Sequence, residues 1–590
     1  MVRSVCLRFA ALGILAAGLL SAPATLFAQS NPTCSDAAGG NGPCDDGKNG
    51  TFAALTAAEV NTLVQIASSA VQSSTMTVAV VDRAGRVLAL YRQPGANPAN
   101  DDLAVGLART SAFFSHNMAP LSSRTVRFIS GVHFPAGVRH AGNAALYGIE
   151  NTNRGCDFNV TFNAGKCIPR ATSVKGLPCN AFDRSGCGTG IVTGKPDEFD
   201  GHKDGHPEGV GLGASALNPG GLPVNPGGVP IFRINTVKVL NKADDGSFDV
   251  IVNRDDAGKP AQANSGMVGG IGVAGVPPDQ AEFSAFFAVA GAAAAAGLKL
   301  FPAPIFPLPP PGRVLIDGIR LPFVDNGTRP AGINNGATNA AGAFVMGPTA
   351  GGCAANRYLS GPIAGSKLTK QEVDTIVHNA VDTAHRTRGY IRLPLNSYAR
   401  MVIAVADVDG SLLALYRMPD ATIFSIDVAV AKSRNVIYFS SNDPNVARDL
   451  PGVPAGTSVT NRTINFGGQP LYPPGQEQTS PGPFFDLFVR DLKNPCSQGF
   501  QPANANQSGI VFFPGATALY KNGQIVGGLG VSGDGVEQDD FVTVGGAGDL
   551  LPDKKIQADK VMIRRVRLPF VKFPRQPEGV TEVLTNADDF

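Results

Sequence analysis

One loop of this sequence holds the densest cluster of potential metal ligands. It begins at Asp197 and reads DEFDGHKDGHPE. Carboxylates and imidazoles recur there at every second position, at Asp200, His202, Asp204 and His206. Both side-chain types are common ligands of divalent cations. The pattern therefore indicates a divalent-cation site, with a solvated polar loop as the alternative.

Four histidines of the sequence fall into two pairs. His378 and His385 are seven residues apart and would share one face of a helix. His133 and His140 flank a Phe-Pro-Ala-Gly loop. Imidazole is the commonest metal ligand among side chains. All four are candidate ligands, and an ordinary place at the surface or in the core is the alternative for each.

Motifs typical of hydrolases and nucleotide-binding proteins are weak or missing. The sequence lacks Gly-x-Ser-x-Gly, His-Glu-x-x-His and P-loop patterns, which favours a binding protein over a hydrolase. Segments that start at Gly270 and Gly528 match G-x-G-x-x-G. A dinucleotide site would also need a parallel βαβ unit and an acidic residue about twenty positions on. An alanine-rich helix follows Gly270 instead, so these glycines favour close packing of a strand end against a helix or a ligand.

The segments that must position these residues occur twice in the chain. Met401–Asn442 repeats Met76–Asn117 without a gap. A repeat of this length indicates two copies of one domain, because the units of a solenoid are far shorter. We call them copy one and copy two.

Local patterns predict the same order of elements in both copies. A capping box at Thr56 and Glu59, which Thr369 and Glu372 repeat, begins a helix. An apolar strand, a Gly-containing turn and a second apolar run then predict a β-hairpin.

A second helix follows this hairpin, because the apolar residues change to helical spacing. Asp102 and Asp427 lie where an acidic residue would cap that helix and favour its dipole. Farther along, Asn522-Gly523 predicts the tight turn of a second hairpin in copy two. The corresponding hairpin of copy one is longer.

The first 28 residues have the pattern of a secretory signal. Arg3 and Arg8 accompany the apolar stretch Phe9–Leu20, which is too short to span a bilayer, and Ala24 or Ala28 offers a cleavage site. We therefore expect an exported protein, periplasmic or secreted, with no membrane span. The formal net charge of +2 and the lack of a basic stripe argue against a nucleic-acid partner.

The cysteines agree with export. Nine are present, and removal of Cys6 with the signal leaves eight. An even number in an oxidising compartment suggests four disulfides. Cys34 and Cys44 could form a local bridge, while the four from Cys156 to Cys187 allow three pairings. A zinc site would need close Cys-x-x-Cys spacing, which is absent.

At 590 residues the chain is long enough for two or three domains. The stiff segment Pro302–Pro311 and the Gly/Ala/Asn-rich stretch after it mark the boundary between the copies. We predict a signal peptide at 1–28, an N-terminal arm at 29–54, domain one at 55–300 with an insertion at 140–226, a tail strand and Pro/Gly-rich linker at 301–367, domain two at 368–550, and a C-terminal tail at 551–590.

Three segments of copy two carry a family pattern. They are Ala404-Val-Ala-Asp407-x-x-Gly410, Ser425–Arg434, and Ile525–Gly533 with the following Glu-Gln-Asp. Together they resemble the GlcG/HbpS-like heme-binding family over about residues 368–541. Copy one matches less closely, with Leu107 at the position of Lys432 and Ala274 at that of Ser532.

For each of the two tandem domains, this resemblance implies an α+β fold, an antiparallel β-sheet flanked by helices. The tandem arrangement and the disulfide-rich loop insertions depart from the family pattern. The resemblance also implies association, here as a homo-oligomer or as an intramolecular pseudo-dimer of the two copies. Its implied ligand is heme, bound for sensing, storage or transfer.

Heme iron usually takes a histidine, cysteine, methionine or tyrosine ligand. Histidine comes first here, because the cysteines are expected to be oxidised. The candidates are His378, His385, His133 and His140. They have no counterparts in the other copy, so the sequence does not predict a duplicated iron site.

Two arginines of copy two, Arg417 and Arg434, repeat Arg92 and Arg109. A guanidinium can bind a carboxylate through two hydrogen bonds, so these residues are candidates for the heme propionates. Ordinary ion pairs with nearby aspartates are the alternative.

Three functions remain open from the sequence. The first is an exported tandem heme-binding protein. The second is a heme- or metal-dependent oxidative enzyme built around the insertion, and the third is a structural or assembly module without a ligand. Binding of heme at a stable stoichiometry without turnover would favour the first.

Overall fold

A computed structural model gives the fold of this protein. The described residues are 52–117, 119–154, 221–234, 238–242, 248–251, 265–295, 299–303, 314–316, 318–325, 329–334, 341–352, 358–393, 396–494, 497–504 and 506–580.

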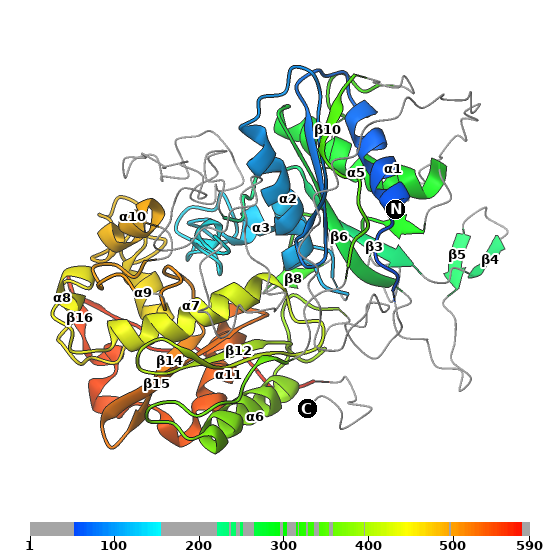
Figure 1. The fold of residues 1–590 in the computed structure, drawn as a ribbon. Coiled ribbons are helices and arrows are strands. Elements are labelled where there is room, and N and C mark those ends of the chain that lie inside the picture. Colours follow the sequence, from blue (N-terminus) through cyan, green and yellow to red (C-terminus); the bar gives the residue numbers. More distant parts are fainter. Residues whose placement is uncertain are drawn as a thin grey trace, which may run out of the picture. The chain divides into compact units, whose positions relative to one another are not determined.

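Copy one is built on a six-stranded antiparallel sheet (Figure 1). Its strands, in spatial order, are β10 (Ala343–Met346), β2 (Val87–Arg92), β1 (Thr77–Asp82), β6 (Ser265–Ala274), β3 (Gly228–Ile234) and β7 (Leu300–Phe301). Helix α2 (Asn100–Phe114) covers one face of the sheet. Helices α1 (Ala57–Ser69) and α5 (Pro278–Ala295) pack on each other and cover the opposite face.

Copy two repeats this arrangement with five strands. Their order is β11 (Tyr358–Ser360), β13 (Leu412–Arg417), β12 (Val402–Ala406), β15 (Gln524–Ser532) and β14 (Ala516–Lys521). Helix α7 (Phe424–Phe439) covers one face, and α6 (Lys370–Arg386) with α11 (Val536–Ala547) covers the other (Figure 1). The predicted α+β class with antiparallel sheets flanked by helices is confirmed.

Shorter elements complete the described chain. They are α3 (Ser123–Ile129), η1 (Ile149–Asn151), β4 (Lys238–Lys242), β5 (Phe248–Ile251), β8 (Leu315–Ile316), β9 (Ile319–Arg320), α8 (Val446–Asp449), α9 (Asn461–Gly467), α10 (Phe485–Lys493), η3 (Gly548–Leu550), η4 (Lys554–Ile556), η5 (Ala558–Lys560), β16 (Met562–Ile563) and β17 (Val566–Arg567).

Several local predictions are confirmed. Both capping boxes form, at the starts of α1 and α6. Asn522 and Gly523 have the positive φ values that a tight hairpin turn requires, 49° and 75°, and connect β14 to β15. The segment between the copies, predicted as a linker, also supplies the edge strands β10 and β11.

The predicted aspartate caps are wrong. Ala99 and Ile423 occupy the N-cap positions of α2 and α7, and neither helix has a side-chain cap. Asp102 and Asp427 lie inside the first turn. The Asp427 carboxylate instead accepts a hydrogen bond from the backbone N–H of Asn153 in copy one, 2.7 Å away.

Glycines of the two G-x-G-x-x-G segments lie under a helix. A Cβ on Gly272 would be 2.1 Å from the Ala104 carbonyl oxygen of α2, and one on Gly530 would be 2.1 Å from that of Ala429 in α7. Since β6 and β15 pair antiparallel with their neighbours, neither segment belongs to a parallel βαβ unit. The glycines serve close packing, as predicted.

The nine cysteines lie outside the described residues, and so does most of the predicted insertion at 140–226. The part of the chain that the structure describes contains no helix with both the length and the hydropathy to cross a bilayer.

Candidate functional site

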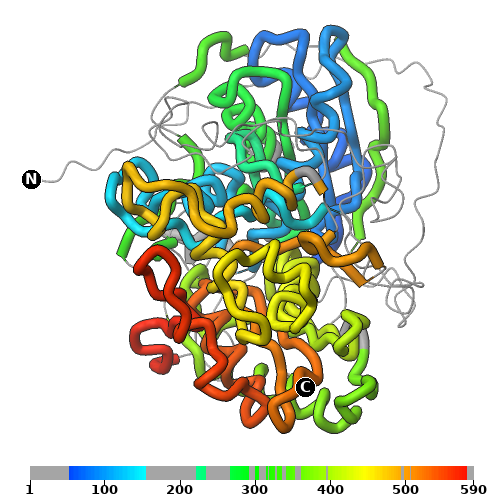
Figure 2. Tube along the Cα trace, turned by 90° about the vertical axis from the view of Figure 1, so that its left-hand side faces the viewer, coloured from blue at the N-terminus to red at the C-terminus, as the bar shows by residue number. Residues whose placement is uncertain are grey.

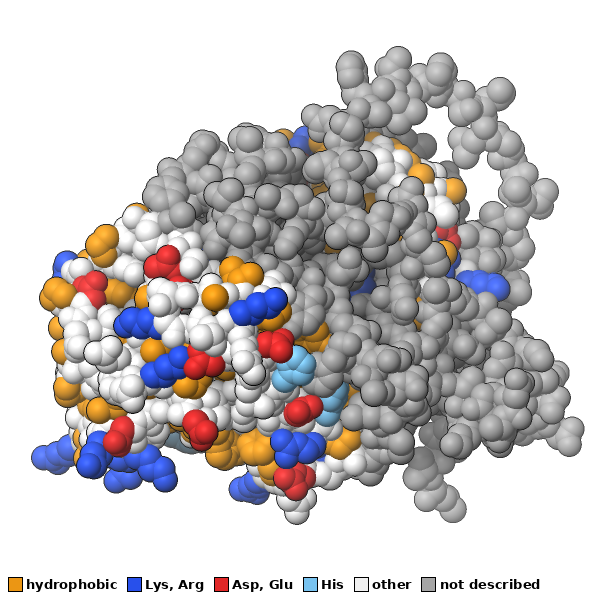
Figure 3. Space-filling model, turned by 60° about the horizontal axis from the view of Figure 1, so that its bottom comes forward, with side chains coloured by type: hydrophobic (Ala, Val, Ile, Leu, Met, Phe, Trp, Pro, Cys, Tyr) orange, Lys and Arg blue, Asp and Glu red, His pale blue; other side chains and the backbone are white. Residues whose placement is uncertain are grey.

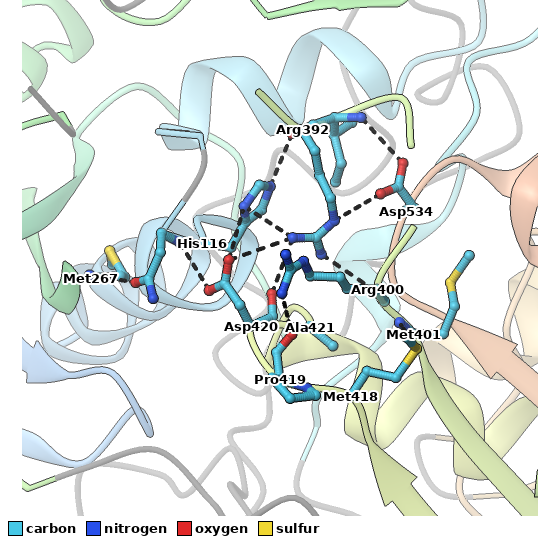
Figure 4. A network of polar contacts seen from close by, with 12 residues as sticks. His116, Met267, Arg392, Arg400, Met401, Met418, Pro419, Asp420, Ala421 and Asp534 are labelled. Carbon is cyan, nitrogen blue, oxygen red and sulfur yellow. Dashed lines mark hydrogen bonds and ion pairs between the residues drawn. The ribbon is translucent and has the colours of Figure 1, made fainter. Parts of the chain in front are cut away.

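A buried group of charged residues joins the two copies at His116, just beyond the end of α2 (Figure 4). The Asp420 carboxylate of copy two accepts from the Arg83 guanidinium at 2.9 Å. Arg392 lies on the other side of Asp420 at 3.6 Å and donates to Asp534 at 3.0 Å. All five side chains are at most 4% exposed. We call this group the interface network.

The geometry indicates that His116 is neutral. Its Nε2 lies 2.9 Å from the Ile391 carbonyl oxygen, so this nitrogen carries the proton and donates. Its Nδ1 lies 3.3 Å from an Arg392 nitrogen, which can donate to it. Burial and the Arg392 charge lower the pKa of His116 to about 4. Both ring nitrogens are engaged within the interface, which leaves His116 a structural part of it.

Asp420 stays ionised despite its burial. Burial alone would raise the pKa of this carboxyl, but the charges of Arg83 and Arg392 bring it below its usual value. The network is also asymmetric, since copy one has Gly95 at the position of Asp420, and copy two has Ser441 at that of His116. The equivalent pair with the copies exchanged, Gly95 and Ser441, therefore has no charged side chains.

A second buried ion pair is confined to copy two. Lys432 of α7 donates to Asp539 of α11 at 3.0 Å and to the Val531 carbonyl oxygen at 2.8 Å. Burial lowers the pKa of Lys432 and raises that of Asp539 to about 6. Copy one holds Leu107 and Ala281 at these two positions, both buried, so apolar side chains stand there in place of the ion pair.

The histidines of α6 differ in exposure. The His378 side chain is 42% exposed, and its Nδ1 donates to the Asp374 carbonyl oxygen at 2.8 Å, with the Asp374 carboxylate at 3.4 Å. His385, two turns on, is half-buried, and its ring meets the Tyr398 ring edge to face at a centroid distance of 5.0 Å. Copy one has Gln65 at the position of His378.

The other two predicted histidines meet at one carboxylate. His133 Nε2 lies 3.3 Å from one oxygen of Glu477, and His140 Nδ1 lies 2.6 Å from the other. His133 is buried, whereas the His140 side chain is 73% exposed. Because the histidines belong to copy one and Glu477 to copy two, this contact links the copies. Figure 2 shows the chain around residue 140 beside the segment that contains α10, where Arg154 pairs with Asp491 at 2.7 Å.

The two predicted arginines are buried. Arg417 donates from Nε and Nη2 to the Ala421 carbonyl oxygen, at 2.9 and 2.6 Å. Arg434 donates to the Gly410 carbonyl oxygen at 2.9 Å and to the Ser508 hydroxyl. Both guanidinium groups therefore hold loops of copy two, and Arg434 also lines a cavity described below.

The predicted metal ligands Asp200, His202, Asp204 and His206 lie outside the described residues. Within the described ranges, no group of three or more histidine, cysteine, aspartate or glutamate residues is arranged to hold a metal ion.

The interface network is what sequence reasoning missed. His116 and Arg392 are 276 positions apart, and no local motif marks either. The only signal in the sequence was the difference between the copies at aligned positions, such as Asp420 against Gly95.

We predict that Lys432 and Asp539 are strongly coupled. Lys432→Leu should leave the buried Asp539 carboxylate without its positive partner and lower the unfolding free energy by about 3–5 kcal/mol. The double variant Lys432→Leu/Asp539→Ala recreates the pair found in copy one and should recover most of that loss. Denaturant titration followed by circular dichroism measures both. A double variant as unstable as the sum of the single variants would contradict the coupling.

We predict a pH dependence from His116. Its pKa is about 4 when folded against 6.5 for the free side chain, so the unfolded chain binds the proton more readily. The contribution of His116 to stability is complete above about pH 6.5 and is lost as the pH falls towards 4, by on the order of 3 kcal/mol. His116→Gln should flatten this part of the stability profile. Equal slopes in both proteins would show that His116 does not titrate in this way.

Comparison with known proteins gives a family. The model of the haem degrading protein HbpS-like family matches residues 55–170 and 368–547. No curated protein matches the chain. Among solved structures, the crystal structure of a PduOC:heme complex is 20% identical with a TM-score of 0.20, and the match covers 30% of this chain and 92% of that one. Klebsiella pneumoniae protein ORFY is 18% identical with a TM-score of 0.20, and the match covers 30% and 86%. With one matched segment in each copy, the chain belongs to the HbpS-like family.

Proposed function

We propose that this protein binds heme and that copy two carries the site, with His378 as the axial ligand. The observation that carries the proposal is membership of a family whose description names haem. The structure bears on which histidine would bind the iron, because only some of the described histidines have a ring that a heme could reach.

His378 makes a hydrogen bond of the kind that metal-binding histidines make. Such residues donate one ring N–H to a carbonyl or carboxylate, which orients the ring and leaves the lone pair on the other nitrogen. The Asp374 carbonyl oxygen takes this role, so Nε2 is the nitrogen that would bind iron. The ring lies on a regular helix, which fixes its position better than a loop does. Figure 3 shows the face that carries α6, where histidine atoms lie at the surface among acidic and basic side chains.

The remaining histidines fit less well. His116 is enclosed, with both nitrogens used in the interface network. His133 is buried against the Ala141 carbonyl oxygen and Glu477. His140 is exposed and oriented by Glu477, but it lies in a loop at a positive φ of 57°. It is the natural comparison for His378.

Heme degradation is a second candidate, because the family description names it. A bound heme supplies the redox chemistry in that case, and the protein would hold the ring and control access to it. Loss of the Soret band of the complex under air with a reductant, accompanied by release of iron, would favour degradation over binding alone.

We predict that heme binding depends on His378. Hemin added to the full mature chain should give a saturable Soret shift. His378→Gln, which introduces the residue that copy one has at this position, should abolish the sharp band, because the iron loses its axial nitrogen. His140→Gln is the matched control and should bind as the wild type does. Broad, non-saturable absorbance in all three proteins would refute heme binding, and loss only in His140→Gln would move the site to copy one.

We also propose that the protein acts outside the cytoplasm, in the periplasm or after secretion. The signal-like first 28 residues and the eight remaining cysteines support this. Mass spectrometry of the protein purified from its native compartment should find a chain that begins after Ala24 or Ala28, with its cysteines oxidised. A full-length, fully reduced chain in the cytoplasm would refute export.

A further inference from the structure

A cavity of about 340 Å³ lies in copy two, at the turn that joins β12 to β13. It is bordered by that turn, by the second half of α7 and by the loop that follows α10. Asp409 and Arg434 line it, together with four residues that carry side-chain amides, Gln498, Gln501, Asn504 and Asn506. We call it the amide cavity.

The amides form a connected wall. Gln498 accepts from Asn435 at 2.7 Å and donates to Gln501 at 2.7 Å. Gln501 also accepts from Gln507 at 3.0 Å, and Asn506 donates to the Asp409 carbonyl oxygen at 3.0 Å. These bonds fix the orientation of the amide groups. The wall is thus ordered by the protein itself.

Some polar atoms of this wall have no protein partner. Within the described residues, Gln501 Nε2 makes no hydrogen bond and neither does Asn506 Oδ1, although the other amide atom of each side chain is bonded. The buried Oε1 of Gln507, directly behind Gln501, also lacks a partner. One donor, Gln501 Nε2, and one acceptor, Asn506 Oδ1, can therefore form hydrogen bonds with a ligand.

One aromatic ring near this turn is placed differently in the two copies. In copy one a Cβ on Gly85 would lie 2.4 Å from the Phe113 ring, so this ring covers the turn. In copy two Asn506 takes the place of that ring, 3.0 Å from a Cβ on Gly410, while Arg434 lies as Arg109 does in copy one. Tyr438, at the position of Phe113, donates its hydroxyl to Asp449 at 2.6 Å. That bond anchors the ring away from the turn.

The charges at the cavity favour a neutral ligand. Arg434 forms one wall, and its guanidinium already donates to Gly410 and Ser508. Asp409, exposed at the turn, supplies a charge of the opposite sign. Val408 and Ile437 add apolar surface. Paired donors and acceptors beside apolar surface match vicinal hydroxyl groups on a carbon frame.

We propose that the amide cavity binds a small neutral polyhydroxylated molecule, a monosaccharide or a polyol. Its volume is near the lower end of the range for ligand pockets, which suits such a molecule. The site lies beside α7, whereas His378 lies on α6, across the sheet. The proposal therefore does not depend on heme binding.

Isothermal titration of the full mature chain with D-glucose, D-ribose and glycerol tests this inference, with sodium acetate as the anionic probe. At least one of the three hydroxylated probes should bind saturably at one site per chain. Gln501→Ala should weaken that binding about tenfold through loss of one hydrogen-bond donor. Gln371→Ala, an exposed glutamine of α6, is the matched control and should leave it unchanged.

Tyr438→Phe provides a second test, because it removes the bond to Asp449 and introduces the residue of copy one. Without that bond the ring, which lines the cavity, should move into it and reduce binding at least as much as Gln501→Ala does. Hemin titration of both variants should match the wild type. Binding of acetate alone, no binding of any hydroxylated probe, or equal binding by wild type and both variants would each overturn the proposal.

Discussion

The close approach of a helix to a glycine-rich strand sets the geometry of both copies. Gly272 and Gly530 leave no room for a Cβ beneath α2 and α7, because a helix carbonyl oxygen lies 2.1 Å from where it would be. A side chain at either position would have to push the helix away from the sheet. This contact fixes the height and direction of α7, and with it Lys432, Arg434 and Tyr438. In copy one the same contact fixes α2, and His116 lies at the interface just beyond the end of that helix.

On this shared frame the two copies have diverged in their polar groups. Copy one has Leu107 and Phe113 where copy two has Lys432 and Tyr438. The apolar side chains of copy one fill space. The polar side chains of copy two require hydrogen-bonding partners, which are Asp539 of α11 and Asp449 of α8. Because a buried charge is costly unless it is paired, Lys432 requires its contact with Asp539.

The two proposed sites use opposite sides of one sheet. Helix α6 carries His378 on one side, and α7 borders the amide cavity on the other. The interface network lies apart from both, and its residues bind one another. Its role is to join the copies.

The sequence by itself determined the duplication, the hairpins and the starts of the first helices. These follow from interactions between residues close in the sequence, such as the Thr369–Glu372 capping box and the Asn522-Gly523 turn. Such interactions can be recognised in short stretches of sequence. It also indicated which histidines share a helix face. Only the tertiary structure decided that His116 is enclosed and His378 exposed, and that the amides of the loop after α10 meet at Gly410. Those outcomes depend on contacts between residues far apart in the chain, for which spacing along the sequence carries no signal.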